Sequence, residues 1–374
     1  MHVQLDQSDL LEMIQAVIDV IPAKATLPML SNVLMTANEG MCTLSGTDLE
    51  ISVTISRSIE AIEEGRATLP ARKFHDIVRE LPAGAVDITE RDGRITLQSS
   101  TGGEYSMLSM APDDYPAIPN SLEDGFSLVM DGDLLSRMIS KVTFAAPSDE
   151  TRPALSGVCW RVSSQQTSML ATDGYRLARI AETVDVEPGE PIEAIVPPRV
   201  LNQAVRLVRP GNELQGIEIG ARQIQFRYAE ADLFARLIEG SYIDVDAVIP
   251  QDNDYHLIAS REALIPAVRR VIILSSQQNH QVKISLRRDM FELSTVDRET
   301  GSEAQEEIGA EYSSEDLALG YNAEYLQEIL NKTDSPQVRF KFREPAAAAI
   351  IEPAAQTEGE NYFFLLMPLR LIDG

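Results

Sequence analysis

The chain has 374 residues, of which 44% are hydrophobic and 24% are charged, a composition typical of a folded protein with two or three domains. No apolar run reaches the roughly 18–20 residues that a membrane-spanning helix needs, and the N-terminus lacks the basic and apolar regions of a secretory signal. The formal charge of −26 argues against nucleic-acid binding over the whole surface, but an acidic exterior with a basic inner surface gives the same total. Cys42 and Cys159 are too few for a disulfide framework, so we expect buried thiols and a cytoplasmic location.

An internal repeat runs through the chain. A strand followed by a short amphipathic helix is predicted three times, in HVQLDQSDLLEMIQAV, FSLVMDGDLLSRMISKV and YHLIASREALIPAVRRV. Apolar trios spaced i, i+4, i+7 begin at Leu10, Leu135 and Leu264, and this spacing places each trio on one helical face. A second helical pattern recurs in LPARKFHDIVREL, VPPRVLNQAVRLV and GYNAEYLQEIL, again at intervals of about 125 residues.

The segments between these helices alternate apolar and polar residues and are broken by Asp-Gly and Gly turns, a pattern that predicts strands. Each unit therefore reads as a strand, a helix, three strands, a helix and three strands. The Pro- and Asp-rich stretches 110–125 and 247–255 read as linkers. We predict an α+β fold of three repeated domains at residues 1–122, 126–250 and 254–374, each with two helices packed on antiparallel sheets.

Sequence motifs of catalysis are absent. No phosphate loop, dinucleotide-binding glycine pattern, HExxH zinc motif or nucleophile elbow occurs, and the four histidines have no metal-ligand spacing. Asp48 and Asp173 occupy matching turns of two repeats, so we interpret them as caps of backbone N–H groups rather than as a catalytic pair. We expect no metal, no cofactor and no enzymatic activity; a hydrolase that uses either carboxylate is the distant alternative.

Seven motifs occur in order along the chain: LPMLSNVLM, GTDLE, LPARKF, SDETRPALSG, ATDGYRLA, GYNAEYL and MPLRL. Together they resemble the bacterial DNA polymerase III beta subunit, the family of replicative sliding clamps. The resemblance covers essentially the whole chain and implies the DNA-clamp fold, closed as a head-to-tail homodimeric ring around duplex DNA. The implied function is to tether the replicative polymerase for processivity. The implied partners bind through short hydrophobic peptide motifs: the polymerase catalytic subunit, the clamp loader, other polymerases and repair proteins.

The resemblance implies that cations on the predicted helices and one loop face the DNA. Acidic residues lie on some of the same helices, so the basic lining is uneven, and ordinary solvated helix faces remain the alternative interpretation. The expected DNA-facing residues are Lys24, Arg72, Lys73, Arg137, Lys141, Arg199, Arg206, Arg209, Arg269 and Arg270.

The resemblance also implies a cleft for the partner peptide, formed by ATDGYRLA and the C-terminal tail. Leu and Met walls would bury apolar peptide side chains, and Arg176 would orient the peptide through its carbonyls. Taken alone, MPLRL reads instead as a closing core strand. The expected cleft residues are Leu155, Thr172, Gly174, Tyr175, Arg176, Leu177, Ile243, Val248, Asn322, Tyr325, Ala346, Leu365, Leu366, Met367, Pro368, Leu369, Arg370 and Leu371.

Several cleft positions depart from the family's usual pattern. Ile243, Asp246 and Ala247 stand where a proline and two basic residues are common. Asn279 occupies a place that is often aromatic, and Ala346, with Ala348, makes that wall smaller. We therefore expect the cleft in its usual place with a retuned peptide preference.

The ring interface is expected between the first domain of one protomer and the third domain of its partner. An edge strand of the first domain would pair with the third domain, and acids of the third domain would face basic groups such as Lys73 and Arg94. The expected interface residues are Tyr105, Met107, Ile273, Leu274, Glu299 and Glu303.

The rival function is an acidic repeat scaffold, or a specialised clamp paralogue, that binds proteins without serving the main polymerase. The two functions differ in topology, because a closed ring stays on circular DNA and slides off a linear end.

Overall fold

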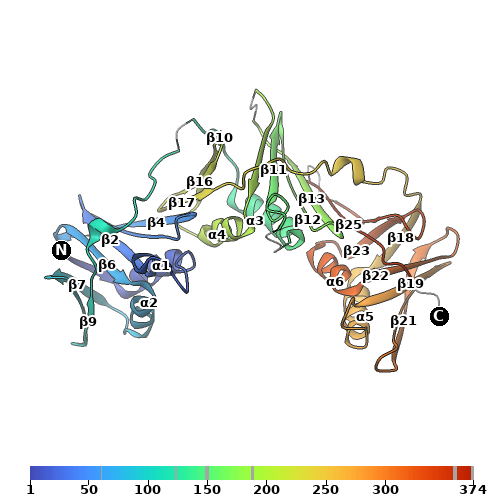
Figure 1. Cartoon of the computed structure of the whole chain (residues 1–374), viewed down its shortest axis with the longest axis horizontal. Helices are drawn as coiled ribbons and strands as arrows, with labels where there is room; N and C mark the ends of the chain where they lie inside the picture. Colours follow the sequence, from blue (N-terminus) through green and yellow to red (C-terminus); the bar gives the residue numbers. More distant parts are fainter. Residues whose placement is uncertain (60, 123, 148–150, 187–188, 357–359, 372–374) are drawn as a thin grey trace. The chain divides into compact units, whose positions relative to one another are not determined.

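The computed structural model describes residues 1–59, 61–122, 124–147, 151–186, 189–356 and 360–371 (Figure 1). Residues 148–150 of the SDETRPALSG motif lie outside this part of the chain. The first repeat contains two helices and nine strands, β1 (His2–Asp6), α1 (Gln7–Ile18), β2 (Asn32–Asn38), β3 (Met41–Thr47), β4 (Ile51–Ser58), β5 (Ala61–Glu63), β6 (Gly65–Pro70), α2 (Ala71–Glu80), β7 (Ala85–Arg91), β8 (Arg94–Ser99) and β9 (Glu104–Leu108).

The second and third repeats have the same order of elements. The second contains β10 (Phe126–Leu128), α3 (Gly132–Val142), β11 (Val158–Ser163), β12 (Gln166–Thr172), β13 (Arg176–Thr183), β14 (Ile192–Val196), α4 (Pro198–Leu207), β15 (Leu214–Ile219), β16 (Gln223–Tyr228) and β17 (Ala231–Arg236). The third contains β18 (Tyr255–Ser260), α5 (Arg261–Ile273), β19 (Gln281–Arg287), β20 (Met290–Asp297), β21 (Ser302–Tyr312), β22 (Leu317–Asn322), α6 (Ala323–Lys332), β23 (Gln337–Phe342), β24 (Ala349–Pro353) and β25 (Glu360–Leu366). The α+β fold of three repeated domains is confirmed.

The predicted number of strands between the two helices of a repeat is wrong. Each repeat has a further strand that leads directly into the second helix, namely β6, β14 and β22, and the first repeat also has the short strand β5. Pattern reading missed them because each of the three passes into its helix without a Gly or Asp turn between them.

Backbone contacts divide the chain into two compact units. The first unit comprises residues 1–135 and 199–237, and the second comprises residues 136–198 and 238–374. Each unit holds one junction between successive repeats, so the units do not coincide with single domains. The domain boundaries 1–122, 126–250 and 254–374 stay a prediction.

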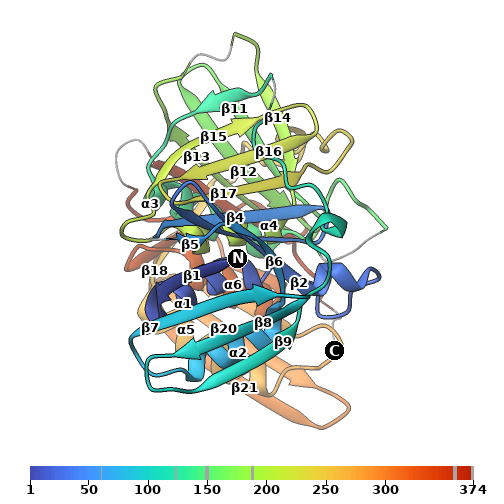
Figure 2. The same cartoon turned by 90° about the vertical axis from the view of Figure 1, so that its left-hand side faces the viewer.

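The strands of each unit form antiparallel sheets. In the first unit a five-stranded sheet has the order β5-β1-β7-β8-β9, and an eight-stranded sheet has the order β10-β15-β16-β17-β4-β3-β2-β6. Figure 2 shows β7, β8 and β9 in front of α2. In the second unit one continuous sheet has the order β14-β11-β12-β13-β25-β24-β23-β18-β21-β20-β19-β22.

The predicted helical faces form the core. Leu10, Leu135 and Leu264 are fully buried, and the residues four and seven positions further along each helix are no more than 1% exposed. In the second helices Phe74 and Leu201 are also fully buried. Their counterpart Tyr325 on α6 is only half-buried, because Leu326 takes the core position instead. None of the helices in the described ranges is long and apolar enough to span a membrane.

Lys141 connects the second and third repeats inside the second unit. This lysine is 2% exposed, and its ammonium donates hydrogen bonds of 2.5 Å to the Lys332 carbonyl at the end of α6 and to the Asp334 carboxylate. It also lies 4.5 Å from the centre of the Tyr362 ring. A cation at a helix C-terminus interacts favourably with the carbonyls that have no partner inside the helix.

Substitution Lys141→Met should lower the free energy of unfolding by about 1–3 kcal/mol, since the apolar stem is kept while the buried charged hydrogen bonds are lost. Chemical denaturation followed by circular dichroism measures this. Lys24→Met, which removes an exposed lysine, is the control and should have almost no effect. Equal stability of the two variants would show that the Lys141 contacts do not hold α3 to α6.

Candidate functional site

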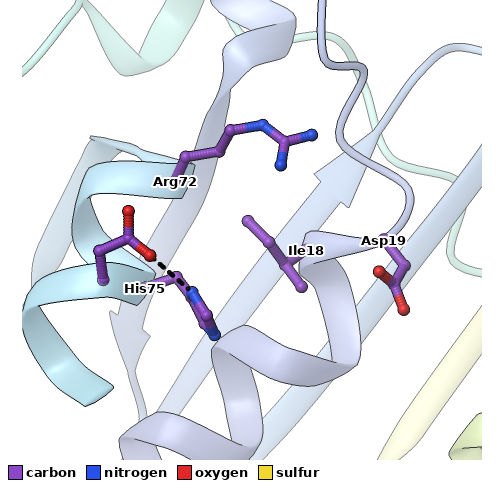
Figure 3. Close-up of a pocket in the computed structure, with 5 residues that line it drawn as sticks. Ile18, Asp19, Arg72 and His75 are labelled. Atoms are coloured by element: carbon purple, nitrogen blue, oxygen red, sulfur yellow. Dashed lines mark hydrogen bonds and ion pairs between the residues drawn. The ribbon is translucent and has the colours of Figure 1, made fainter. Parts of the chain in front are cut away.

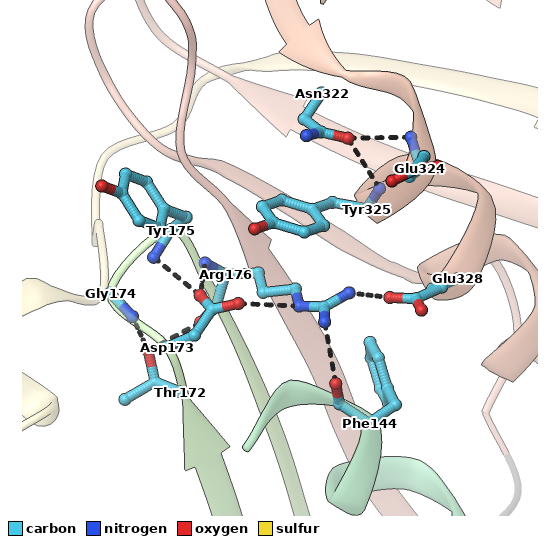
Figure 4. Close-up of polar contacts among 10 residues, drawn as sticks. All are labelled: Phe144, Thr172, Asp173, Gly174, Tyr175, Arg176, Asn322, Glu324, Tyr325 and Glu328. Atoms are coloured by element: carbon cyan, nitrogen blue, oxygen red, sulfur yellow. Dashed lines mark hydrogen bonds and ion pairs between the residues drawn. The ribbon is translucent and has the colours of Figure 1, made fainter. Parts of the chain in front are cut away.

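The turn between β12 and β13 is built by its own polar side chains (Figure 4). The Thr172 hydroxyl donates to the Arg176 carbonyl at 2.6 Å and accepts from the Gly174 N–H at 3.1 Å. One oxygen of Asp173 accepts from the N–H groups of Tyr175 and Arg176 at 2.8 and 2.9 Å. Gly174 has a φ of +92°, a conformation that glycine adopts without steric cost.

The β3–β4 turn of the first repeat has the same construction. The Thr47 hydroxyl donates to the Ile51 carbonyl at 2.9 Å, and Asp48 accepts from the N–H groups of Glu50 and Ile51 at 3.0 and 2.7 Å. The interpretation of Asp48 and Asp173 as caps of backbone N–H groups is therefore confirmed.

Arg176 holds three elements together at the base of the Thr172–Arg176 turn. Its Nε donates to Asp173 at 3.1 Å, one Nη donates to the Phe144 carbonyl at 2.9 Å, and the other pairs with Glu328 of α6. The guanidinium carbon lies 4.3 Å from the centre of the Tyr325 ring (Figure 4). Because three donors are already used and the side chain is 11% exposed, Arg176 positions the cleft rather than presenting a free guanidinium to a peptide.

An apolar cleft of about 450 Å³ lies beside this turn. Its walls come from the turn, from the segment after β17 and from the end of β25, so residues far apart in sequence meet there. Beneath it lies a buried cluster that includes Cys159, Leu170 and Tyr242. The lining residues are Thr172, Gly174, Arg176, Leu177, Ile243, Val245, Val248, Pro250, Ala347, Ala348, Leu365 and Met367.

Eight of the predicted cleft residues line this cleft: Thr172, Gly174, Arg176, Leu177, Ile243, Val248, Leu365 and Met367. Three more lie next to it. Leu155 packs on the cluster beneath the cleft, Leu366 pairs with Arg176, and Tyr175, which is 60% exposed, stands in the turn between the lining residues Gly174 and Arg176. Val245, Pro250 and Ala347 were missed by the sequence reading. Alternating apolar residues in the 243–250 segment were the available signal.

The remaining predicted cleft residues have other surroundings. Asn322 caps α6 by accepting from the N–H groups of Glu324 and Tyr325, and Ala346 is exposed outside the lining. The Leu369 N–H donates to the Gly320 carbonyl at 2.7 Å, and the Arg370 carbonyl accepts from Gln281. Pro368 stands between Met367 and these contacts, and Leu371 lines a separate polar groove with Asn279.

Asp246 explains one departure in the cleft segment. Its carboxylate accepts from Arg179 at 2.9 Å and from Arg161 at 3.4 Å, so it is turned toward the β11–β13 surface.

Burial raises the pKa of the Cys159 thiol to about 12, and the nearby Glu193 carboxylate adds to this, so the thiol stays protonated. Burial raises the pKa of Cys42 in the same way. Within the described residues no group of His, Cys, Asp and Glu is arranged to hold a metal ion.

Most of the predicted DNA-facing cations are paired with acids of their own chain. Arg199 pairs with Asp48, Arg206 with Asp19, Arg209 with Glu12, Arg137 with Glu182, and Arg270 with Glu306. Lys141 is buried and cannot face DNA, so that prediction is wrong; its stem packs against Tyr362 in the junction. Of the predicted DNA-facing cations, Lys24, Arg72, Lys73 and Arg269 have no ion-pair partner among the described residues, and all four are exposed.

Arg72 lines an open polar pocket of about 370 Å³ with Ile18, Asp19, His75 and Asp76 (Figure 3). Arg72 belongs to the first turn of α2, which has no acidic residue and no side-chain cap. Backbone N–H groups and basic side chains at such a helix end favour phosphate oxygens. Lys24, Arg72 and Lys73, with this helix end, are candidate DNA-facing groups of the first unit, and Arg269 is a candidate of the second.

The predicted interface residues are mostly exposed. Ile273 is 78% exposed, Tyr105 is 39% exposed and Leu274 is 38% exposed. Leu108, which was not among the predicted residues, is 69% exposed at the end of β9. Met107 is buried within its own chain, so only its backbone is available to a partner. Glu299 and Glu303 are exposed acids of the third repeat.

Three sequence profiles match nearly the whole chain. They describe the N-terminal, central and C-terminal domains of the DNA polymerase III beta subunit and match residues 1–119, 129–244 and 246–370. The chain belongs to the DNA polymerase III beta subunit family. The predicted sliding-clamp function is confirmed, and nothing favours the acidic scaffold that the sequence left open.

Relatives of this family are similar along their full length. The beta sliding clamp of Pseudomonas putida is 28% identical, with 99% of this chain and 100% of the relative covered. That of Bacillus subtilis is 26% identical with the same coverage. A crystal structure of the sliding clamp from Pseudomonas aeruginosa has a TM-score of 0.92 at 27% identity and covers 99% of this chain and 100% of its own.

Substitution Arg176→Met should lower the free energy of unfolding by about 2–3 kcal/mol, because charged hydrogen bonds to largely buried groups are lost. It should also raise the pKa of Tyr325 further. Burial and the Asp173 carboxylate already raise that pKa, and the Arg176 cation opposes them. Denaturation and NMR titration of ¹³C-labelled tyrosine measure the two effects.

Arg343→Met is the matched control, since Arg343 forms an exposed ion pair with Asp252. It should change stability by less than about 1 kcal/mol and leave the Tyr325 pKa unchanged. If Arg176→Met behaved like this control, Arg176 would not hold the cleft together.

Proposed function

We propose that two copies of this chain close a head-to-tail ring around duplex DNA and hold partner proteins through peptides bound in the apolar cleft. The ring is a non-catalytic tether of the cytoplasm. The observation that carries this proposal is the repeated junction: two junctions exist within the chain, and each of the two strands of a third has an edge that pairs with no other strand of the described residues.

The two internal junctions have the same strand pairing. In the first unit β17 pairs with β4, and in the second unit β25 pairs with β13, both antiparallel. The Arg236 N–H donates to the Glu50 carbonyl at 3.0 Å, and the equivalent Met367 N–H donates to the Tyr175 carbonyl at 2.8 Å. The last strand of one repeat thus pairs with the third strand after the first helix of the repeat before it.

The third junction would use β9 and β21, which occupy the equivalent places in the first and third repeats. In the described part of the chain β9 pairs only with β8, and residues 302–309 of β21 pair only with β20. An edge strand with one free row of backbone groups is a template for pairing with another chain.

The apolar residue at the end of the first helix in each repeat supports this assignment. Val20 and Ala145, ten positions after Leu10 and Leu135, are 1% and 0% exposed in the internal junctions. The equivalent Leu274 is 38% exposed, beside the 78% exposed Ile273. Burial of these two side chains by a second copy would complete the pattern and contribute favourable hydrophobic free energy.

The strand register of the third junction follows from the internal ones. Glu303 pairs with Val296 in the β20–β21 hairpin as Ser52 pairs with Thr47 in the β3–β4 hairpin, so Glu303 is the equivalent of Ser52. Met107 pairs with Ile95 as Ala235 pairs with Ile224, so Met107 is the equivalent of Ala235. Ala235 pairs with Ile51 in the first junction. By equivalence, Met107 of one copy pairs with the partner's Ser302, and Ser106 with the partner's Glu303.

Contact with DNA is weak by construction. Of the ten cations predicted to face the DNA, only Lys24, Arg72, Lys73 and Arg269 are exposed without an acid partner among the described residues, so the positive potential is diffuse and the contact is sensitive to salt. A diffuse potential allows movement along the duplex, whereas many tight phosphate contacts would fix the ring in place. Retention on DNA then comes from ring closure.

The cleft supplies the tether. A partner held by a short peptide stays at a high effective concentration near the DNA, so modest peptide affinity suffices. Apolar side chains of the peptide would be buried against Val248, Leu177 and Met367, and the polymerase, clamp loader and repair proteins are the expected partners. Clamps from Pseudomonas aeruginosa and Bartonella birtlesii bind griselimycin, which supports ligand binding in this family.

A fluorescein-labelled Gln-Leu-Ser-Leu-Phe peptide should bind saturably in a polarisation titration. The double variant Met367→Ala with Val248→Ala should bind at least fivefold more weakly, because both exposed apolar walls are shortened at a cost of about 1–3 kcal/mol. Leu371→Ala is the control, since Leu371 lines a different groove, and should bind like the unmodified protein. Binding that is insensitive to the double variant would place the peptide elsewhere.

The pair Ser106→Cys with Glu303→Cys should form a disulfide-linked dimer under mild oxidation, since directly opposed residues of antiparallel strands bring their Cβ atoms within reach of a disulfide. Non-reducing electrophoresis measures the yield. The pair Ser106→Cys with Gln305→Cys is shifted by two residues along β21 and should yield much less. Equal yields, or none for the first pair, would contradict this interface.

A further inference from the structure

A second groove, in the first unit, matches the apolar cleft element by element. It has a volume of about 280 Å³ and is formed by the β3–β4 turn, the segment after β9 and the end of β17. Its lining residues are Thr47, Leu49, Glu50, Ser52, Ala117, Pro119, Gln223, Phe234, Ala235 and Arg236.

The equivalence holds for all three walls. Thr47 and Thr172 make the same hydrogen bonds in the two turns. Phe234 to Arg236 of β17 stand where Leu365 to Met367 of β25 stand, as the matching strand pairings show. The third wall comes in both cases from the extended segment before the next repeat, with Ala117 and Pro119 here and Val248 and Pro250 in the cleft.

The backbone conformation of Leu49 indicates that the groove has a role of its own. Its φ is +80°, in the left-handed region, where the equivalent Gly174 has a φ of +92°. An ordinary side chain in this conformation costs roughly 1–2 kcal/mol, and Leu49 is nonetheless 47% exposed, so burial does not recover that cost. Strained residues persist where the surrounding structure or a ligand requires them.

The chemistry of the groove differs from that of the cleft. Glu50 and Arg236 stand at its rim, 3.5 Å apart and both well exposed, where the cleft has Tyr175 and Met367. Buried Phe234 and Ala235 form an apolar floor. The smaller volume leaves room for fewer apolar side chains than the cleft takes, and the charged rim suits polar flanking residues.

We propose that this groove, bounded by Leu49, Ala117 and Phe234, binds a short extended segment of a partner protein through a single aliphatic side chain. It would give each protomer a second, weaker peptide site. This proposal rests on the proposed binding of peptides in the apolar cleft, which the groove resembles. Binding is followed separately at each site, through Ala117 in the groove and Met367 in the cleft.

The probe is the acetylated, amidated tetrapeptide Gln-Leu-Ser-Leu, titrated into the full chain labelled at Ala and Met methyl groups. The Ala117 methyl NMR signal reports on the groove and the Met367 methyl on the cleft. The Ala117 signal is expected to shift saturably, at higher peptide concentration than the Met367 signal.

Leu49→Gly should weaken the peptide affinity at Ala117 at least threefold and leave the affinity at Met367 unchanged. This variant should fold, because glycine adopts the required φ freely. Glu39→Gly is the matched control, because it likewise replaces an exposed residue of positive φ (51°) by glycine but lies outside the groove, and it should change the affinity less than twofold. An unchanged affinity at Ala117 in Leu49→Gly, or no saturable shift of Ala117 in the original protein, overturns this site. Loss of the Met367 response instead counts against the peptide cleft alone.

Discussion

Antiparallel pairing between the last strand of one repeat and an edge strand of the repeat before it organises this protein. The β17–β4 and β25–β13 pairs merge the sheets of neighbouring repeats into continuous ones. Both apolar grooves lie against these pairs, and Arg176 and Lys141 make their contacts across the second one. The same pairing between two copies would produce the ring, so fold, cleft and assembly depend on one interaction.

Local charge pairing reconciles an acidic chain with a role on DNA. Arginines of α3, α4 and α5 are largely neutralised by carboxylates of the same protomer, as the Arg206–Asp19 and Arg270–Glu306 pairs illustrate. Exposed pairs of this kind contribute little to stability, roughly 0–1 kcal/mol each. Their main effect is to reduce the positive electrostatic potential at these helices, which favours a mobile ring over a fixed one.

The sequence predicted the repeat and its helical faces well, because Leu10, Leu135 and Leu264 carry a strong periodic signal that the core satisfies. It also located the Thr172–Leu177 side of the cleft through the family resemblance. Burial of a charge was not predictable: Lys141 sits on a helix like any exposed lysine, and only tertiary contacts with Asp334 and Tyr362 remove it from solvent. The course of the tail after Met367 was not predictable for a similar reason, since the Leu369–Gly320 bridge, which is not local, places Leu371 beside a separate groove.

The construction of the cleft from two repeats has a thermodynamic consequence. A peptide that touches both β13 and the end of β25 binds only while the two repeats are joined, so by linkage its binding free energy adds to the stability of that junction. A protomer with a partner docked is then less prone to local opening than an empty one. Clamps with a bound partner would resist disassembly and proteolysis longer than clamps without one. The partner proteins would therefore protect the ring for as long as they stay bound.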